Sequence, residues 1–138
     1  MERRLELVLR GRAIFEGKAE GYALVCPDSI TGWGGVNDEG VITEPHHVHR
    51  GESIKGKVVL LPGGKGSCGW SCHYTALKVL GNAPAAWVLS HADSRTGVAV
   101  VTMEIPAVCD FDRDPFQVIR DGDWLKVDGY NGTVEIWR

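Results

Sequence analysis

The segment Lys57-Val58-Val59-Leu60-Leu61-Pro62-Gly63-Gly64-Lys65-Gly66-Ser67 decides the fold of this chain. Its first half is a continuous apolar run, which predicts a buried strand that ends at Pro62. Residues 68–80 follow with aromatic and aliphatic side chains at helical spacing, and Gly81 suits the position just past a helix end. Because the next apolar run, 85–89, predicts another strand, the whole segment is a βαβ-like unit.

Strands are predicted on both sides of this central unit. They cover residues 5–15, 21–25, 106–109, 124–127 and 133–137, and the last two form a hairpin. The sequence between 97 and 103 fits either a strand or a short helix. The glycine- and proline-rich stretch from 26 to 56 predicts a long loop, which is usually functional or covers a neighbour. The sum is a β-rich α/β fold, and the lack of any linker or repeat predicts a single domain over 1–138.

Composition and charge exclude several classes of protein. The chain has 138 residues, of which 43% are apolar, so one folded domain with its own core is expected. Its 15 lysines and arginines against 18 aspartates and glutamates give a net charge of −3, which argues against nucleic-acid binding by bulk electrostatics. No apolar run approaches the roughly 20 residues that span a bilayer, and the charged start lacks the apolar stretch of a signal peptide. We therefore expect a cytoplasmic protein without a membrane partner.

The strongest candidate for chemistry is the glycine loop, residues 62–69. Glycines between a strand and a helix let backbone N–H groups converge on a carboxylate or phosphate, and the start of the helix favours the same anions. Lys65 would add a positive charge, and Ser67 stands where an N-cap residue belongs. The loop is not a Walker A motif, because Gly66 stands where that motif needs Ser or Thr. A capped turn with a surface lysine explains the same residues equally well.

The tripeptide Trp33-Gly34-Gly35 in the long loop is a second candidate. Its tryptophan could pack over a substrate or a partner, or it could anchor the loop to the core. The aspartates of the second half are interpreted as turn residues from their context. They are Asp93, Asp110, Asp112, Asp114, Asp121 and Asp123.

The segment His46–His49 is a third candidate. With Cys68, Cys72, His73 or Cys109 it could bind zinc, but the spacing matches no standard zinc finger. Clustered loop histidines are more often solvated or hydrogen-bonded. The cysteines are interpreted as reduced thiols, with packing as their commoner role.

Several short motifs occur in an order and spacing that resemble a known family. They are Gly11-Arg12-Ala13, Ala19-Glu20-Gly21, Trp33-Gly34-Gly35-Val36, His47, Gly51-Glu52-Ser53-Ile54, Gly56-Lys57-Val58, Pro62–Ser67, Ala83-Pro84-Ala85-Ala86 and Ile105-Pro106. Together they cover nearly the whole chain. The sequence resembles the small, swivelling subunit of aconitase X, a distant branch of the aconitase superfamily.

This resemblance implies a swivelling β/β/α domain that closes over a separate large subunit. That large subunit would carry iron, as a cluster or a single ion, and this chain would hold no metal or cofactor of its own. Ser67 matches the family's loop serine, which acts on a proton. The expected substrate-binding residues are Gly64, Lys65, Gly66, Cys68, Trp33, Gly34, Gly35 and His47.

The chain departs from the family pattern in two places. Lys65 replaces the usual arginine, which keeps the charge but loses a bidentate grip on a carboxylate. The segment 68–72 replaces a Ser/Thr-rich stretch.

The resemblance implies an enzyme, a dehydratase subunit that is active only with its large subunit, in a heterodimer or a higher assembly. Two activities are compatible. The favoured one is the dehydration of cis-3-hydroxy-L-proline, a small carboxylate, to Δ1-pyrroline-2-carboxylate, and the alternative is the dehydration of mevalonate 5-phosphate. A hypothesis of another class is a stand-alone metal- or anion-binding module.

Overall fold

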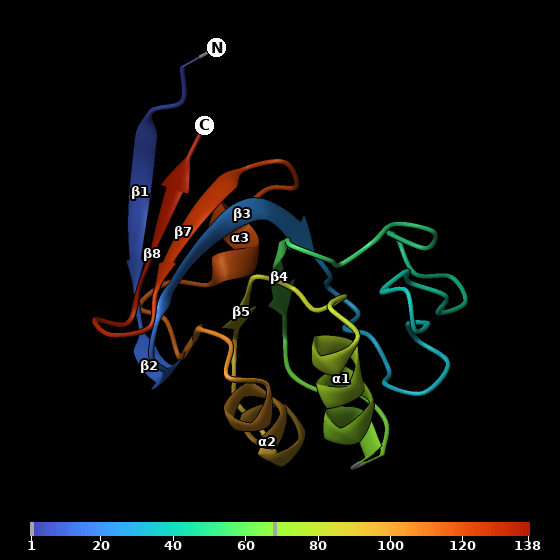
Figure 1. Cartoon of the computed structure of the whole chain (residues 1–138). Helices are drawn as coiled ribbons and strands as arrows, with labels where there is room; N and C mark the ends of the chain where they lie inside the picture. The colour runs from blue at the N-terminus through green and yellow to red at the C-terminus, as the bar shows by residue number, and fades with distance from the viewer. Residues whose placement is uncertain (1, 68) are drawn as a thin grey trace.

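The computed structural model describes residues 2–67 and 69–138 (Figure 1). The elements are, in chain order, β1 (Leu5–Arg10), β2 (Arg12–Phe15), β3 (Lys18–Val25), β4 (Val58–Leu61), α1 (Gly69–Val79), β5 (Ala86–Leu89), α2 (Ser94–Met103), β6 (Ala107–Cys109), α3 (Pro115–Val118), β7 (Trp124–Asp128) and β8 (Thr133–Trp137). The strand, glycine loop, helix and strand predicted around the central segment correspond to β4, α1 and β5. The βαβ-like unit is therefore confirmed.

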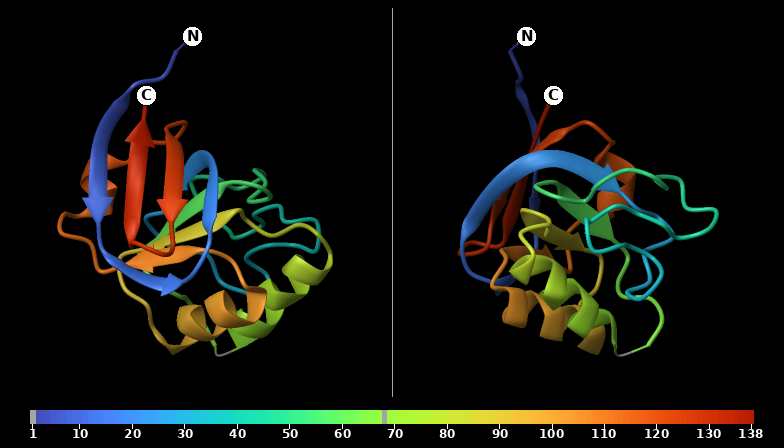
Figure 2. Two further views of the ribbon diagram at one scale, coloured as in Figure 1. Left: turned by 60° about the vertical axis from the view of Figure 1, so that its left-hand side comes forward. Right: turned by 45° about the vertical axis from the view of Figure 1, so that its right-hand side comes forward.

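One mixed sheet with the strand order β1-β8-β7-β3-β4-β5-β6-β2 forms the body of the protein. Strands β3, β4, β5 and β6 are parallel to one another, whereas the pairs on either side of them are antiparallel. The long strand β3 belongs to both parts, because Lys18–Tyr22 pair with β7 and Ala23–Val25 pair with β4. Figure 2 shows β3 as a strongly bent ribbon that joins the two parts.

Gly11 bends the chain so that the sheet curls round on itself. Strands β1 and β2 lie at opposite ends of the strand order, yet only Gly11 separates them in the sequence. The Gly11 amide donates to the Gly132 carbonyl at 2.7 Å. A Cβ atom at position 11 would lie 2.4 Å from the Cys109 carbonyl oxygen. Only glycine lets the backbone approach β6 this closely.

The parallel strands are buried on both faces, which explains their continuous apolar runs. Val58 and Leu60 of β4 face the interior of the curled sheet. Val59 and Leu61 face the layer formed by α1 and α2, where Trp70 and Tyr74 pack. The two helices lie side by side on one face of the sheet (Figures 1 and 2). The prediction of a β-rich α/β fold is thus confirmed.

The structure adds to the sequence-based predictions in three segments. The ambiguous stretch 97–103 is helical, because Asp93 caps a helix that begins at Ser94. The long loop has no regular strand among its described residues and is held by isolated bridges such as Val36 with Ile42. The short helix α3 was not predicted. None of the helices in the described part of the chain has the length and apolar character needed to cross a membrane.

The close approach at Gly11 can be tested by adding a single methyl group. Gly11→Ala is expected to lower the free energy of unfolding by about 2 kcal/mol or more, because its Cβ would clash with β6. Gly97→Ala inside α2 is the matched control, since a Cβ there meets no atom within 4 Å. Alanine at that position should stabilise the helix by roughly 0.5–1 kcal/mol. Urea unfolding measures both variants, and equal stabilities would contradict the role given to Gly11.

Candidate functional site

The carboxyl ends of the parallel strands gather at one edge of the sheet. Residues 62–67 follow β4, residues 90–93 follow β5, and residues 26–57 follow β3. In open α/β sheets this edge is the usual place for a ligand. The glycine loop predicted from the sequence therefore lies where a binding site is expected.

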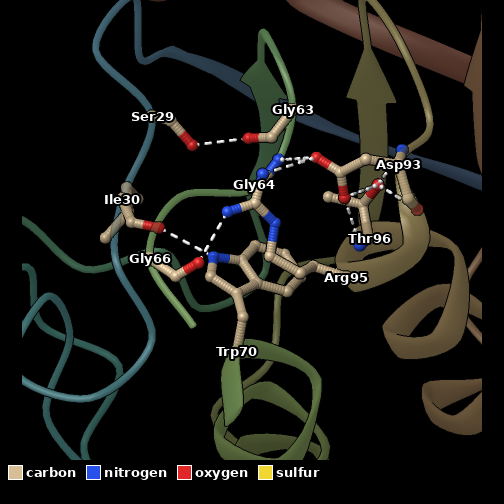
Figure 3. A network of polar contacts seen from close by, with 9 residues as sticks. All are labelled: Ser29, Ile30, Gly63, Gly64, Gly66, Trp70, Asp93, Arg95 and Thr96. Carbon is tan, nitrogen blue, oxygen red and sulfur yellow. Dashed lines mark hydrogen bonds and ion pairs between the residues drawn. The ribbon is translucent and has the colours of Figure 1, made fainter. Parts of the chain in front are cut away.

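The backbone of the glycine loop is held by three polar side chains (Figure 3). The Gly64 amide donates to Asp93 Oδ2 at 2.8 Å. The Ser29 hydroxyl donates to the Gly63 carbonyl at 2.5 Å, and Arg95 Nη1 donates to the Gly66 carbonyl at 2.6 Å. These contacts come from the start of the long loop and from the first turn of α2, so two segments distant in sequence fix the same loop.

The far side of the loop presents free hydrogen-bond donors. Within residues 2–67 and 69–138, the amides of Lys65, Gly66 and Ser67 have no acceptor, and all three residues are exposed. Gly66 has a φ of +87°, which turns the chain into the start of α1. The Ser67 hydroxyl oxygen accepts from the Gly69 amide at 3.3 Å, at the start of α1. The N-cap role of Ser67 stays a prediction. Successive free amides at the start of a helix form a concavity that suits an anion.

Lys65 forms an ion pair with Glu44. Its ammonium lies 2.9 Å from Glu44, whose side chain is only 8% exposed and also accepts from the Thr31 amide and hydroxyl. Burial raises the pKa of Glu44, but the hydrogen bonds from Thr31 and Lys65 outweigh burial, so its pKa lies below the ordinary value. An anion at the loop would therefore meet a lysine whose charge is already partly balanced.

Asp93 and Arg95 are site residues that the sequence analysis missed. Asp93 was interpreted as an ordinary turn residue, but it caps α2 and binds the Gly64 amide. Burial acts to raise the pKa of Asp93, whereas hydrogen bonds from the Thr96 and Gly64 amides and from Arg95 lower it below its ordinary value. The sequence does place Asp93 shortly after the predicted strand β5. Because β5 and β4 are parallel and end at the same edge of the sheet, this position could have indicated that Asp93 lies near the glycine loop.

The predicted Trp33-Gly34-Gly35 segment lies against the start of α1. The Trp33 side chain is 63% exposed, and its ring centroid is 4.6 Å from that of His73. A Cβ on Gly69 would lie 2.8 Å from Trp33 Nε1, so the indole covers the helix start next to Ser67. A Cβ on Gly35 would lie 2.1 Å from the Thr31 carbonyl oxygen, which makes glycine necessary in this turn. The structure thus brings the tryptophan segment and the glycine loop together.

His47 is buried within its own segment. Its Nδ1 accepts from the His49 amide at 3.0 Å, and its own amide donates to the Glu44 carbonyl, so its hydrogen bonds do not reach the glycine loop. His49 lies between two carboxylates, with Nδ1 2.5 Å from Glu52 and Nε2 3.1 Å from Asp121, the latter at ion-pair distance without hydrogen-bond geometry. A substrate contact of His47 stays a prediction.

The described residues among those considered for zinc do not form a cluster. No group of three or more His, Cys, Asp or Glu side chains among the described residues is arranged to hold a metal ion. Cys26 and Cys109 are buried free thiols, and Cys72 is an exposed one. Burial raises the pKa of Cys26 to about 12, so this thiol stays protonated at neutral pH. Cys68, expected at the substrate, lies outside the described residues.

Comparison with known proteins identifies the family. The family model of the aconitase X swivel domain matches residues 8–136. The chain belongs to the aconitase X swivel-domain family. Its fold is also that of a solved aconitase X structure, the holo-form from Thermococcus kodakaraensis, with a TM-score of 0.88 and 35% identity over 95% of this chain and 98% of that chain. A solution NMR structure of a UPF0107 protein matches with a TM-score of 0.83 and 34% identity over 94% of this chain and 98% of that one.

Curated relatives of this swivel domain carry a specific name. The "Phosphomevalonate dehydratase small subunit" of Methanosarcina acetivorans is 37% identical over 129 residues, which is 93% of this chain and 90% of the relative. The protein of the same name from Pyrococcus furiosus is 36% identical over 93% of this chain and 94% of the relative. These findings confirm the resemblance and the swivelling fold. The cytoplasmic location and the exclusion of nucleic acid stay predictions.

The ion pair of Lys65 with Glu44 predicts a pH-dependent stability. Lys65→Met is expected to lower the free energy of unfolding at pH 7 by about 1–3 kcal/mol, because the nearly buried Glu44 carboxylate loses its cation. The pKa of Glu44 is depressed in the folded state, so this stabilisation is present above the ordinary pKa of a glutamate and is lost as the pH falls through the folded-state value.

The difference between Lys65→Met and the unmodified chain should therefore narrow below about pH 4. Denaturant unfolding at a series of pH values measures it, with Lys55→Met, a change of an exposed lysine in the long loop, as the control. A loss of stability that stays the same from pH 7 to pH 3 would contradict the pairing.

Proposed function

We propose that this chain is the small subunit of a two-subunit aconitase X dehydratase, and that the assembled enzyme dehydrates mevalonate 5-phosphate. The family match and the names of the relatives from Methanosarcina and Pyrococcus support the substrate. The preference for cis-3-hydroxy-L-proline has no support among these relatives. The observation that supports the proposal most strongly is the exposed Ser67, at a loop where the amides of residues 65–67 have no acceptor among the described residues.

Ser67 is the residue proposed to act on a proton of the substrate. Its oxygen accepts from the Gly69 amide and lies at the N-terminus of α1, and both features stabilise a negative charge on that oxygen. An alkoxide stabilised in this way can take a proton from carbon. Closure of the swivel domain over the large subunit would then exclude water from this step.

The amides of residues 65–67 are proposed to hold one anionic group of the substrate. Mevalonate 5-phosphate has a carboxylate and a phosphate, and either group suits converging N–H donors. Lys65 would add its charge in competition with Glu44. The Gly64 amide is not proposed to bind the substrate, because it already donates to Asp93. Gly64 is proposed to leave room for the substrate by its lack of a side chain. Trp33, with Gly34 and Gly35 at its side, is proposed to form a wall of the same site.

The remaining chemistry is assigned to the large subunit. Iron held there would act as a Lewis acid on the leaving hydroxyl. The described residues of this chain offer no cluster that could hold the metal in its place. The exposed Trp33 and Val48 give the long loop apolar surface that a partner subunit could cover, with exposures of 63% and 68%.

Purification of the tagged chain from its native host tests the partnership. We expect a larger chain in stoichiometric amount together with iron, and turnover of mevalonate 5-phosphate by the pair. Turnover of cis-3-hydroxy-L-proline alone would replace the proposed substrate. A lone chain would contradict the partnership, and stoichiometric zinc on it would favour a stand-alone metal-binding module.

Ser67→Ala in the assembled enzyme is expected to lower kcat at least about a hundredfold, because it removes the proposed base. Ser53→Ala is the matched control, since that hydroxyl accepts only from a nearby turn amide, that of Lys55, in the long loop. Steady-state kinetics on mevalonate 5-phosphate measures both variants. A kcat for Ser67→Ala within a few-fold of the control would remove Ser67 from the mechanism.

A further inference from the structure

We propose that Asp93 and Arg95 are positioning residues that fix the glycine loop in its active shape. This inference rests on the proposed function, because it assigns these side chains to the loop that carries Ser67. Neither residue is expected to touch the substrate. Their task is to hold the loop backbone through the Gly64 amide and the Gly66 carbonyl (Figure 3). The amides of residues 65–67 have no acceptor among the described residues and so stay available to a ligand.

The two residues bind complementary atoms of the loop. Asp93 Oδ2 accepts the Gly64 amide at 2.8 Å, and Arg95 Nη1 donates to the Gly66 carbonyl at 2.6 Å. Arg95 Nη2 also lies 3.2 Å from Asp93 Oδ2, so the two side chains form one linked unit. Together they contact the loop on both sides of Lys65. A backbone held at two such points loses most of the freedom to rotate its remaining amides.

The glycines of the loop are explained by this close contact. A Cβ on Gly64 would lie 2.9 Å from Arg95 Nε and 3.2 Å from Asp93 Oδ1. A Cβ on Gly63 would lie 3.2 Å from Asp93 Oδ2. Neither glycine has a positive φ, so backbone conformation alone does not require glycine at these two positions. The lack of a side chain at Gly63 and Gly64 leaves room for Asp93 and Arg95. Glycine at position 66 is favoured for a different reason, the positive φ of the turn.

Asp93 is itself held in place by hydrogen bonds at the start of α2. Asp93 is the N-cap of α2, where its Oδ1 accepts from the Thr96 amide at 2.9 Å, and in return the Thr96 hydroxyl oxygen accepts from the Asp93 amide at 3.0 Å, which completes a capping box. Thr75 of α1 and Thr102 of α2 are joined by a hydrogen bond of 2.8 Å between their hydroxyls. The loop is therefore held by α2 at the same time as it leads into α1, and the two helices pack together.

Arg95 also balances the negative charge of Asp93 next to the glycine loop. Hydrogen bonds keep the pKa of Asp93 below its ordinary value, so this carboxylate is ionised at neutral pH. A bare carboxylate next to an anion site would repel an anionic substrate. Arg95 balances that charge while it holds Gly66. Loss of Arg95 is therefore expected to loosen the loop and to weaken substrate binding.

Arg95→Met tests the inference, because methionine keeps an unbranched apolar stem and removes the charge and the donors. In the assembled enzyme we expect kcat/KM for mevalonate 5-phosphate to fall at least about tenfold, with a raised KM as one component. Arg95→Lys keeps the charge and one donor, and should recover activity to within about threefold of the unmodified enzyme. A purely structural role of the side chain would not distinguish lysine from methionine.

Arg138→Met is the matched control. Arg138 also binds an aspartate, Asp123, and a backbone carbonyl, that of Val118, without contacting the glycine loop. Its activity should stay within twofold of the unmodified enzyme. Equal activity losses in Arg95→Met and Arg138→Met, or a lysine variant as impaired as the methionine variant, would overturn the inference.

Amide hydrogen exchange of the full 138-residue chain separates this inference from the proposed function. Exchange of the Gly64 amide should accelerate at least about tenfold in Arg95→Met and remain unchanged in Arg138→Met. That result supports the positioning role whatever the substrate is. If the unmodified enzyme leaves mevalonate 5-phosphate intact, the proposed function fails while the exchange experiment still decides the inference. Unchanged exchange of Gly64 in Arg95→Met would overturn it.

Discussion

The parallel pairing of β4 with β3 and β5 is the constraint on which the site depends. Parallel strands end at the same edge, so the segments that follow them meet there even though they lie far apart in the sequence. In this way Ser29 after β3 binds the carbonyl of Gly63 after β4, and Asp93 after β5 binds the amide of Gly64. Burial on both faces holds the strands in register. The bend at Gly11 joins the two end strands of the sheet, β1 and β2.

Two ion pairs lie beside the glycine loop at this edge. Lys65 pairs with Glu44, and Arg95 pairs with Asp93. Because both cations are balanced by carboxylates, the proposed anion site depends chiefly on the amides of residues 65–67, which have no acceptor among the described residues. Lys65 is therefore expected to attract an anion less strongly than the sequence alone suggests.

The sequence predicts the central unit well because its information is local. The apolar run of β4 and the helical spacing of α1 each depend on neighbours along the chain. The roles of Asp93 and Glu44 could not be predicted in the same way, because their partners lie 29 and 21 residues away. An aspartate before a helix looks the same whether or not its second oxygen binds a distant amide.

A crystal structure of the chain assembled with its large subunit and mevalonate 5-phosphate would show whether the glycine loop binds the substrate. We predict that the glycine loop faces the large subunit across the bound substrate. The amides of residues 65–67 should lie within about 3.2 Å of a substrate carboxylate or phosphate oxygen. The Ser67 hydroxyl should point at the carbon that loses its proton. A complex in which this loop faces solvent, with the substrate bound elsewhere, would contradict the account.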